Sequence, residues 1–201
     1  MHKRRFLAGA AAAGLWTTGP ASATAPSPSR HPGLLTVSGA IGAGNRGPLD
    51  PMLDQMMAKH GIRFERAHVF DATALQKLPA VTIEPTLEYD ERPHRLRGPL
   101  LSSVLQAAGV KPDAEVMLGL RAVDGYNVML SLADATKYRM VVATHMDGRP
   151  MALGGLGPQW AVYDADRVAP FKDQPLKQRF GLCPWGLYHI DVSATRAPAS
   201  R

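Results

Sequence analysis

The residue with the most specific chemistry in this chain is Cys183, the single cysteine. A cysteine thiolate is a soft, anionic ligand for transition metals and also a nucleophile. A lone cysteine cannot form an internal disulfide, so a packed core must stabilise the fold. The setting, Gly181-Leu182-Cys183-Pro184-Trp185, favours a small, partly buried residue, and a metal ligand or redox thiol is the alternative.

The histidines form no recognisable catalytic or metal-binding motif. No two of them have the His-x-x-x-His spacing that places two ligands on one helix face. The sequence also contains neither a Gly-x-Ser-x-Gly nucleophile elbow nor a phosphate-binding P-loop. We therefore expect hydrogen-bonded or exposed side chains, rather than catalytic ones, at His60, His68, His94, His145 and His189.

Two segments could bind a small anion. In the first, a basic run from Arg92 to Arg97, the side chains of Arg95 and Arg97 could hold a carboxylate or a phosphate. A solvated loop is the alternative. The second is the glycine-rich stretch that ends at Gly157, whose amides could approach a phosphate. It lacks the strand-to-helix setting of a dinucleotide loop, so turn formation is favoured there.

Asp124-Gly125-Tyr126 is a turn signal with a possible second role. Gly125 permits a positive φ angle, and the Asp124 side chain can accept a hydrogen bond from the backbone two residues on. The turn could also line the mouth of a pocket. Candidate ligand-binding residues are therefore Arg95, Arg97, Asp124, Tyr126 and Gly157.

These residues fall among short strands and short helices. Apolar spacing predicts helices after Asp50-Pro51, after an N-cap at Asp71, and over 99–108 with Gly109 as the cap. In the first helix, Met52, Leu53, Met56 and Met57 would face the core. The absence of strand–helix–strand alternation predicts an α+β domain on a mixed sheet. The expected strands are 34–39, 81–89, 115–122, 128–131, 140–145, 151–153, 160–163 and 186–192.

The beginning of the chain resembles an export signal. A basic start and a short apolar run precede Ala21-Ser22-Ala23, which suits a signal peptidase, and Arg4-Arg5 suits twin-arginine export. Residues 1–23 are the expected leader, 24–33 a disordered linker, 34–192 the domain and 193–201 a disordered tail. Three of the 23 Lys and Arg residues, and no acid, lie in the leader, so its removal lowers the net charge from +6 to +3. No basic face typical of a nucleic-acid binder then remains, and no membrane anchor is expected.

Four motifs in order resemble the oxidoreductase molybdopterin-binding domain of the sulfite oxidase fold. They are Phe70 to Pro79, Gly98 to Leu105, Ala122 to Tyr126, and Gly157-Pro158 followed by an apolar strand to Val162. Relatives in that family include sulfite oxidases and the exported catalytic subunit of the periplasmic methionine sulfoxide reductase. The resemblance implies a sulfite-oxidase-type fold over essentially the whole domain.

The resemblance also implies a molybdenum ligand that this chain lacks. Catalytic family members carry a cysteine thiolate about a dozen residues before the glycine matched by Gly98, where this chain has Thr86. A threonine hydroxyl is a poor substitute for soft, anionic sulfur. The sequence therefore predicts an exported, non-catalytic binding module without a cofactor, for a small anionic ligand or a periplasmic partner such as a sensor ectodomain. The alternatives are a molybdopterin oxidoreductase with atypical ligation, in which Cys183 could serve, and a purely structural protein.

Overall fold

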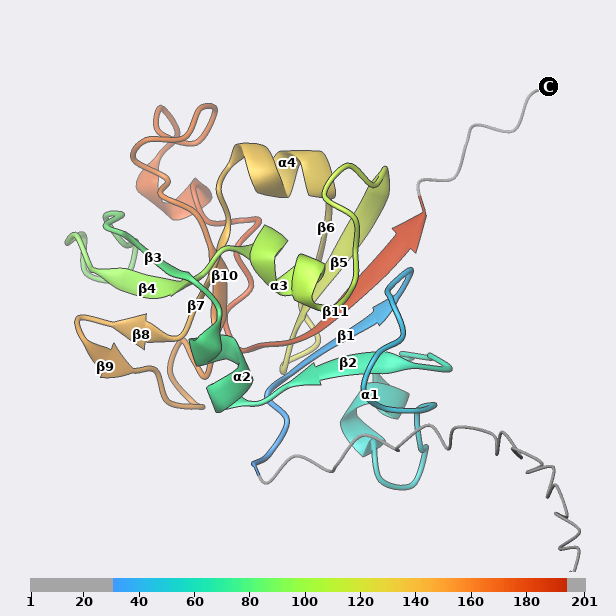
Figure 1. The fold of residues 1–201 in the computed structure, drawn as a ribbon. Helices are drawn as coiled ribbons and strands as arrows, with labels where there is room; N and C mark the ends of the chain where they lie inside the picture. Colours follow the sequence, from blue (N-terminus) through green and yellow to red (C-terminus); the bar gives the residue numbers. More distant parts are fainter. Residues whose placement is uncertain (1–30, 195–201) are drawn as a thin grey trace, which may run out of the picture.

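A computed structural model describes residues 31–194 (Figure 1). The expected leader, most of the expected linker and residues 195–201 of the expected tail lie outside the described residues. The last strand continues two residues beyond the expected domain end at Val192, to Ala194. Within residues 31–194, no helix has the length and apolar character that crossing a bilayer requires.

The larger sheet has five strands in the order β2-β1-β11-β5-β6. Strands β1 and β11 are parallel and the other neighbouring pairs are antiparallel, so the sheet is mixed. The last strand of the described chain therefore occupies the middle of the sheet (Figure 1). The bounds are β1 Leu35–Gly39, β2 Ala67–Phe70, β5 Val116–Ala122, β6 Asn127–Ser131 and β11 Leu187–Ala194.

Two smaller sheets lie beside the larger one, a four-stranded sheet β3-β4-β8-β9 and a two-stranded sheet β10-β7. They meet where β4 passes β7: a Cβ added at Gly98 would lie 1.9 Å from the Val142 carbonyl oxygen, so only glycine permits this approach. The bounds are β3 Ala80–Ile83, β4 Leu96–Pro99, β7 Val141–Ala143, β8 His145–Met146, β9 Arg149–Pro150 and β10 Trp160–Val162.

Short helices fill the corners of this arrangement. Helix α3 (Leu101–Ala107) buries Leu101, Val104 and Leu105, and it packs against α4 (Leu132–Lys137). The carboxylate of Asp71 accepts the Ala74 N–H at 2.7 Å and so begins α2 (Ala72–Lys77). Helix α1 (Gln55–Lys59) and the 3-10 turn η1 (Leu176–Gln178) bury no residue.

The expected α+β class, with a mixed sheet and short helices, is confirmed. The Asp71 cap is present, and Gly109 adopts φ 85° after α3. The expected 81–89 strand ends at Ile83 instead, two residues before Pro85, which has no N–H to donate to a ladder. Residues 151–153 do not form a strand element; the backbone before them turns back in the β8–β9 hairpin.

Two features of the helices differ from the sequence-based expectations. Helix α4 was not expected, although Ser131 and Asp134 form the reciprocal cap typical of a helix start. The expected core-facing stripe around α1 is wrong, because Met52 and Leu53 are 77% and 84% exposed. The reason is that α1 begins only at Gln55, so Met52 and Leu53 lie in the turn before the helix and not on one of its faces.

Candidate functional site

The two arginines of the sequence-predicted site lie on β4 and the residue before it. Both side chains are exposed. Arg97 pairs with Thr82 on one side and with His145 of β8 on the other, and the Arg95 N–H donates to the Asp147 carboxylate at 2.9 Å. These strands hold the backbone firmly, while the guanidinium groups make no hydrogen bond or ion pair with the described residues.

Two contacts of the His94 side chain, which we call the histidine clasp, hold the chain around these arginines in place. His94 Nδ1 contacts the Asp147 carboxylate at 2.7 Å, and its Nε2 contacts Asp90 at 2.9 Å. The hydrogen bonds that His94 donates to the Asp147 and Asp90 carboxylates raise the pKa of His94, and the pKa of each carboxyl is lowered in turn. The clasp fastens the loop before β4 to the β8–β9 turn, so His94 has a structural role.

Asp124 and Tyr126 line a different hollow, of about 320 Å³. The Asp124 carboxylate accepts the Tyr126 N–H at 2.9 Å, Gly125 has φ 94°, and the Tyr126 hydroxyl donates to the Gly181 carbonyl oxygen at 2.8 Å. We call this space the aromatic hollow. Its lining consists of Glu88, Tyr89, Ala122, Asp124, Tyr126, Lys177, Phe180, Gly181, Cys183 and Trp185. Arg95, Arg97 and Gly157 are not among these residues.

Gly157 packs against backbone. A Cβ added there would lie 2.3 Å from the Met151 carbonyl oxygen, and the Gly157 carbonyl itself lies 3.6 Å from the Cβ position of Gly186. The glycine thus permits a close approach between chain segments that neighbour the Asp124 turn. The structure brings Asp124 and Tyr126 together, and it leaves the arginine pair on another sheet.

The residues that could bind a molybdenum–pterin group do not fit it. Burial raises the pKa of the Cys183 thiol to about 12, so at neutral pH the side chain is protonated and is not a thiolate. The side chain is only 3% exposed. Thr86 offers a neutral hydroxyl, and its N–H is committed to the Asp166 carboxylate at 2.7 Å. Neither residue supplies the soft, anionic sulfur that such a metal centre requires.

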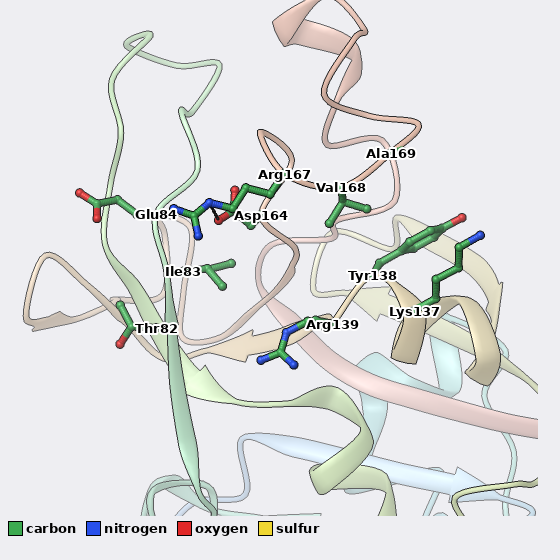
Figure 2. A pocket seen from close by; sticks show the side chains of 10 residues that line it. All are labelled: Thr82, Ile83, Glu84, Lys137, Tyr138, Arg139, Asp164, Arg167, Val168 and Ala169. Carbon is green, nitrogen blue, oxygen red and sulfur yellow. Dashed lines mark ion pairs between the residues drawn. The ribbon is translucent and has the colours of Figure 1, made fainter.

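A second hollow, of about 610 Å³, contains a set of charges that the sequence did not single out (Figure 2). Three segments line it: the end of β3 at 82–84, the end of α4 at 137–139, and the chain after β10 at 164 and 167–169. We call it the Arg139 hollow. It contains three basic side chains, those of Lys137, Arg139 and Arg167, and two acidic ones, those of Glu84 and Asp164.

Arg139 occupies a backbone position that usually belongs to glycine. Its φ angle is 51°, its N–H donates to Thr136 O at 3.0 Å, and the next N–H, from Met140, donates to Ala135 O at 3.0 Å. This is the Schellman ending of a helix, in which a side chain costs roughly 1–2 kcal/mol. Figure 2 shows the guanidinium reaching from the end of α4 into the hollow, below Ile83 and Val168. It makes no hydrogen bond or ion pair with the described residues.

Asp164 lies across the hollow, half-buried. One carboxylate oxygen contacts Arg167 Nε at 3.5 Å, and the other, Oδ1, is buried without a hydrogen-bond partner in the described residues (Figure 2). Burial raises the pKa of Asp164, and the Arg167 guanidinium partly offsets that effect.

Sequence reasoning missed the Arg139 hollow because its three segments are far apart in the chain. The available signal was local: the Ser131-to-Asp134 cap starts a helix that must end near Arg139. No pattern of that kind connects α4 to Asp164 or to β3, whose proximity is tertiary.

Comparison with known proteins shows a likeness in structure and none in sequence to a family model or a curated protein. No protein-family model matches the chain, and no curated protein matches it in sequence. The structure is similar to the crystal structure of the sulfane dehydrogenase SoxCD from Paracoccus pantotrophus, with a TM-score of 0.52 and 14% sequence identity. The match covers 88% of this chain and 42% of the solved one. The chain has a sulfite-oxidase-type α+β fold. At this identity the likeness concerns the fold alone, and it spans less than half of the solved chain.

Proposed function

We propose that the protein is an exported, non-catalytic binding module on the sulfite-oxidase-type fold, and that it holds a small anion in the Arg139 hollow. The observation that carries the proposal is the Arg139 guanidinium, which faces the hollow without a partner in residues 31–194.

The charges and shape of the hollow favour an anion with a short carbon skeleton. Basic side chains outnumber acidic ones in its lining, and Arg167 already neutralises one oxygen of Asp164. A carboxylate or phosphate group would accept the donors of Arg139, with which it can form paired hydrogen bonds. Ile83 and Val168 supply apolar contact for the remainder of the ligand.

The chemistry of the thiol argues against molybdenum-dependent catalysis in particular. With the pKa of Cys183 near 12 and a threonine at position 86, no thiolate is available in the described residues at neutral pH. Export rests on the leader sequence, 1–23. A periplasmic protein such as a sensor ectodomain would be the partner to which a ligand-bound module reports.

An Arg139→Gly variant tests the proposal. We expect the affinity for inorganic phosphate or succinate to fall roughly tenfold or more, because a charged hydrogen-bonding group is lost. The free energy of unfolding should rise by about 1 kcal/mol, because glycine tolerates the left-handed backbone. Titration calorimetry and urea unfolding measure the two quantities.

Glu91→Gly is the matched control. Glu91 has φ 59° on an exposed loop outside the Arg139 hollow, so the variant should gain stability in the same way and keep its ligand affinity. If Arg139→Gly binds these anions as tightly as the parent, or if the parent binds none of them, the proposal is wrong.

The molybdopterin alternative has a direct test. The protein is purified from a host that makes molybdenum cofactor, and bound molybdenum and pterin fluorescence are measured. We expect neither at stoichiometric amounts. Stoichiometric metal that is lost in Cys183→Ser would establish the oxidoreductase instead.

A further inference from the structure

The exposed aromatic side chains of the described chain gather around one hollow. Among residues 31–194, the aromatic residues that are largely exposed are Tyr89, Tyr126 and Trp185, at 57%, 51% and 39%. All three line the aromatic hollow, although Tyr89 and Trp185 are separated by nearly a hundred residues in sequence. Large aromatic rings are normally buried, so three exposed rings at one place indicate a surface that another molecule covers.

The rings are held in position before any ligand arrives. The hydrogen bond from the Tyr126 hydroxyl to Gly181 O fixes one ring across the hollow, and the Asp124 turn fixes its backbone. The Trp185 side chain lies close enough to the Tyr89 hydroxyl to offset part of the rise that burial causes in the pKa of Tyr89. Since these contacts restrict the side chains in the free protein, binding requires little further ordering.

The charge of the hollow is acidic, in contrast to the Arg139 hollow. Its lining contains the carboxylates of Glu88 and Asp124 and one opposing base, Lys177. Glu88 is half-buried and makes no hydrogen bond or ion pair with the described residues. Glu88 lines the hollow together with Tyr89 and Cys183, and its negative charge contributes to raising the pKa of both.

We propose that the aromatic hollow binds a small organic cation bearing an alkylated ammonium group. The faces of tyrosine and tryptophan rings attract weakly hydrated cations through the ring quadrupole. The unpaired Glu88 carboxylate supplies the opposite charge, and a volume of about 320 Å³ suits a compact ligand. A bare metal ion would need several oxygen, nitrogen or sulfur ligands, and no cluster of three such side chains exists in the described residues. The site is independent of the anion proposed for the Arg139 hollow.

The experiment compares choline with its neutral isostere 3,3-dimethylbutan-1-ol, on the full-length protein, by titration calorimetry. We expect saturable choline binding and at least tenfold weaker binding of the isostere, since the two differ in charge and not in shape. Equal binding of the two, or binding of neither, overturns the proposal. Binding of methyl glucoside in place of choline would assign the hollow to a carbohydrate and would also overturn it.

Variants distinguish the contribution of the aromatic rings to choline binding from that of the Glu88 charge. Trp185→Leu and Tyr89→Leu should each weaken choline binding roughly three- to tenfold, which is the range for a partly exposed cation–π contact. Two ring positions are used so that a folding defect in one variant does not decide the test. Glu88→Gln should weaken the binding of choline and leave that of the isostere unchanged.

Glu91→Gln is the matched control for charge, because it removes a carboxylate from the same loop outside the hollow. It should bind choline as the parent does. If Glu88→Gln and Glu91→Gln have the same effect, the hollow does not recognise the cation through Glu88, and the proposal fails. Arg139→Gly must leave choline binding unchanged, because the two hollows have no lining residue in common.

Discussion

Individual residues here show how burial controls chemistry. Cys183 and His189 belong to types that often react or ligate, yet each is nearly fully buried. Burial disfavours the charged form in both cases, so the pKa of the thiol is raised to about 12 and that of the imidazole is lowered to about 4. His189 Nε2 is 2.9 Å from the Ser38 hydroxyl, a pair enclosed between neighbouring strands. The residue types can be read from the sequence, but their reactivity depends on burial that only the fold determines.

The buried histidine predicts a pH dependence of stability. The folded pKa near 4 lies below the ordinary value of 6.5, so the unfolded chain binds the proton more readily between these values. The free energy of unfolding should therefore fall as pH decreases from about 6.5 towards 4, by up to roughly 3 kcal/mol from this group.

Urea unfolding of the parent and of His189→Gln at pH 7.5 and pH 5 isolates this contribution. The parent should lose more stability than the variant on acidification. The clasp at His94 works in the opposite direction, because its pKa is raised, and it remains in both proteins. Equal losses in parent and variant would contradict the assignment to His189.

At the scale of elements, the sequence predicted the helix ends correctly where a single residue determines the local backbone geometry. Asp71 capped its helix and Gly109 ended another as expected. Apolar spacing was less reliable, because it reports that a face is apolar and not which element covers it. Around α1 the face is exposed, whereas the face of α3 lies in the core.

Substitutions in the exposed turn before α1 and on the buried face of α3 should therefore differ sharply in their effect on the free energy of unfolding. Replacing both Met52 and Leu53 with Gln should change the free energy of unfolding by less than about 0.5 kcal/mol, as is usual for exposed positions. Leu101→Ala in α3 should cost about 2–5 kcal/mol, because it removes buried methyl groups and leaves a cavity. Urea unfolding measures both, and a comparable loss in the double variant would show that the α1 face is covered in solution.

At the scale of the whole molecule, the three sheets found in residues 31–194 pack around one core, and loops between their strands line the two hollows. The α+β class and the sulfite-oxidase type of the fold could be predicted from ordered motifs. The division into three sheets could not, because strand pairing depends on long-range contacts. For the same reason the predicted site combined Arg95 with Asp124, whereas the structure places Arg139 opposite Asp164.

The close contact between the two smaller sheets at Gly98 predicts that a larger residue there destabilises the whole fold. A Gly98→Ala substitution would place a methyl group against the Val142 backbone, and neither strand can move without disturbing its own sheet. We expect a loss of several kcal/mol or failure to fold. Gly148→Ala is the comparison: no atom lies within 4 Å of its Cβ position, and the cost should be limited to its positive φ. Thermal unfolding distinguishes the two.

The position of β11 in the middle of the five-stranded sheet affects how the chain can be made. The Ser38–His189 pair spans 151 residues of sequence, and β1 cannot acquire its parallel neighbour until β11 has been synthesised. A growing chain therefore exposes an unpaired edge on β1, and later one on β5, until β11 has been made, which is a setting that favours aggregation. Chaperone binding during synthesis should persist until the final strand leaves the ribosome and closes the sheet.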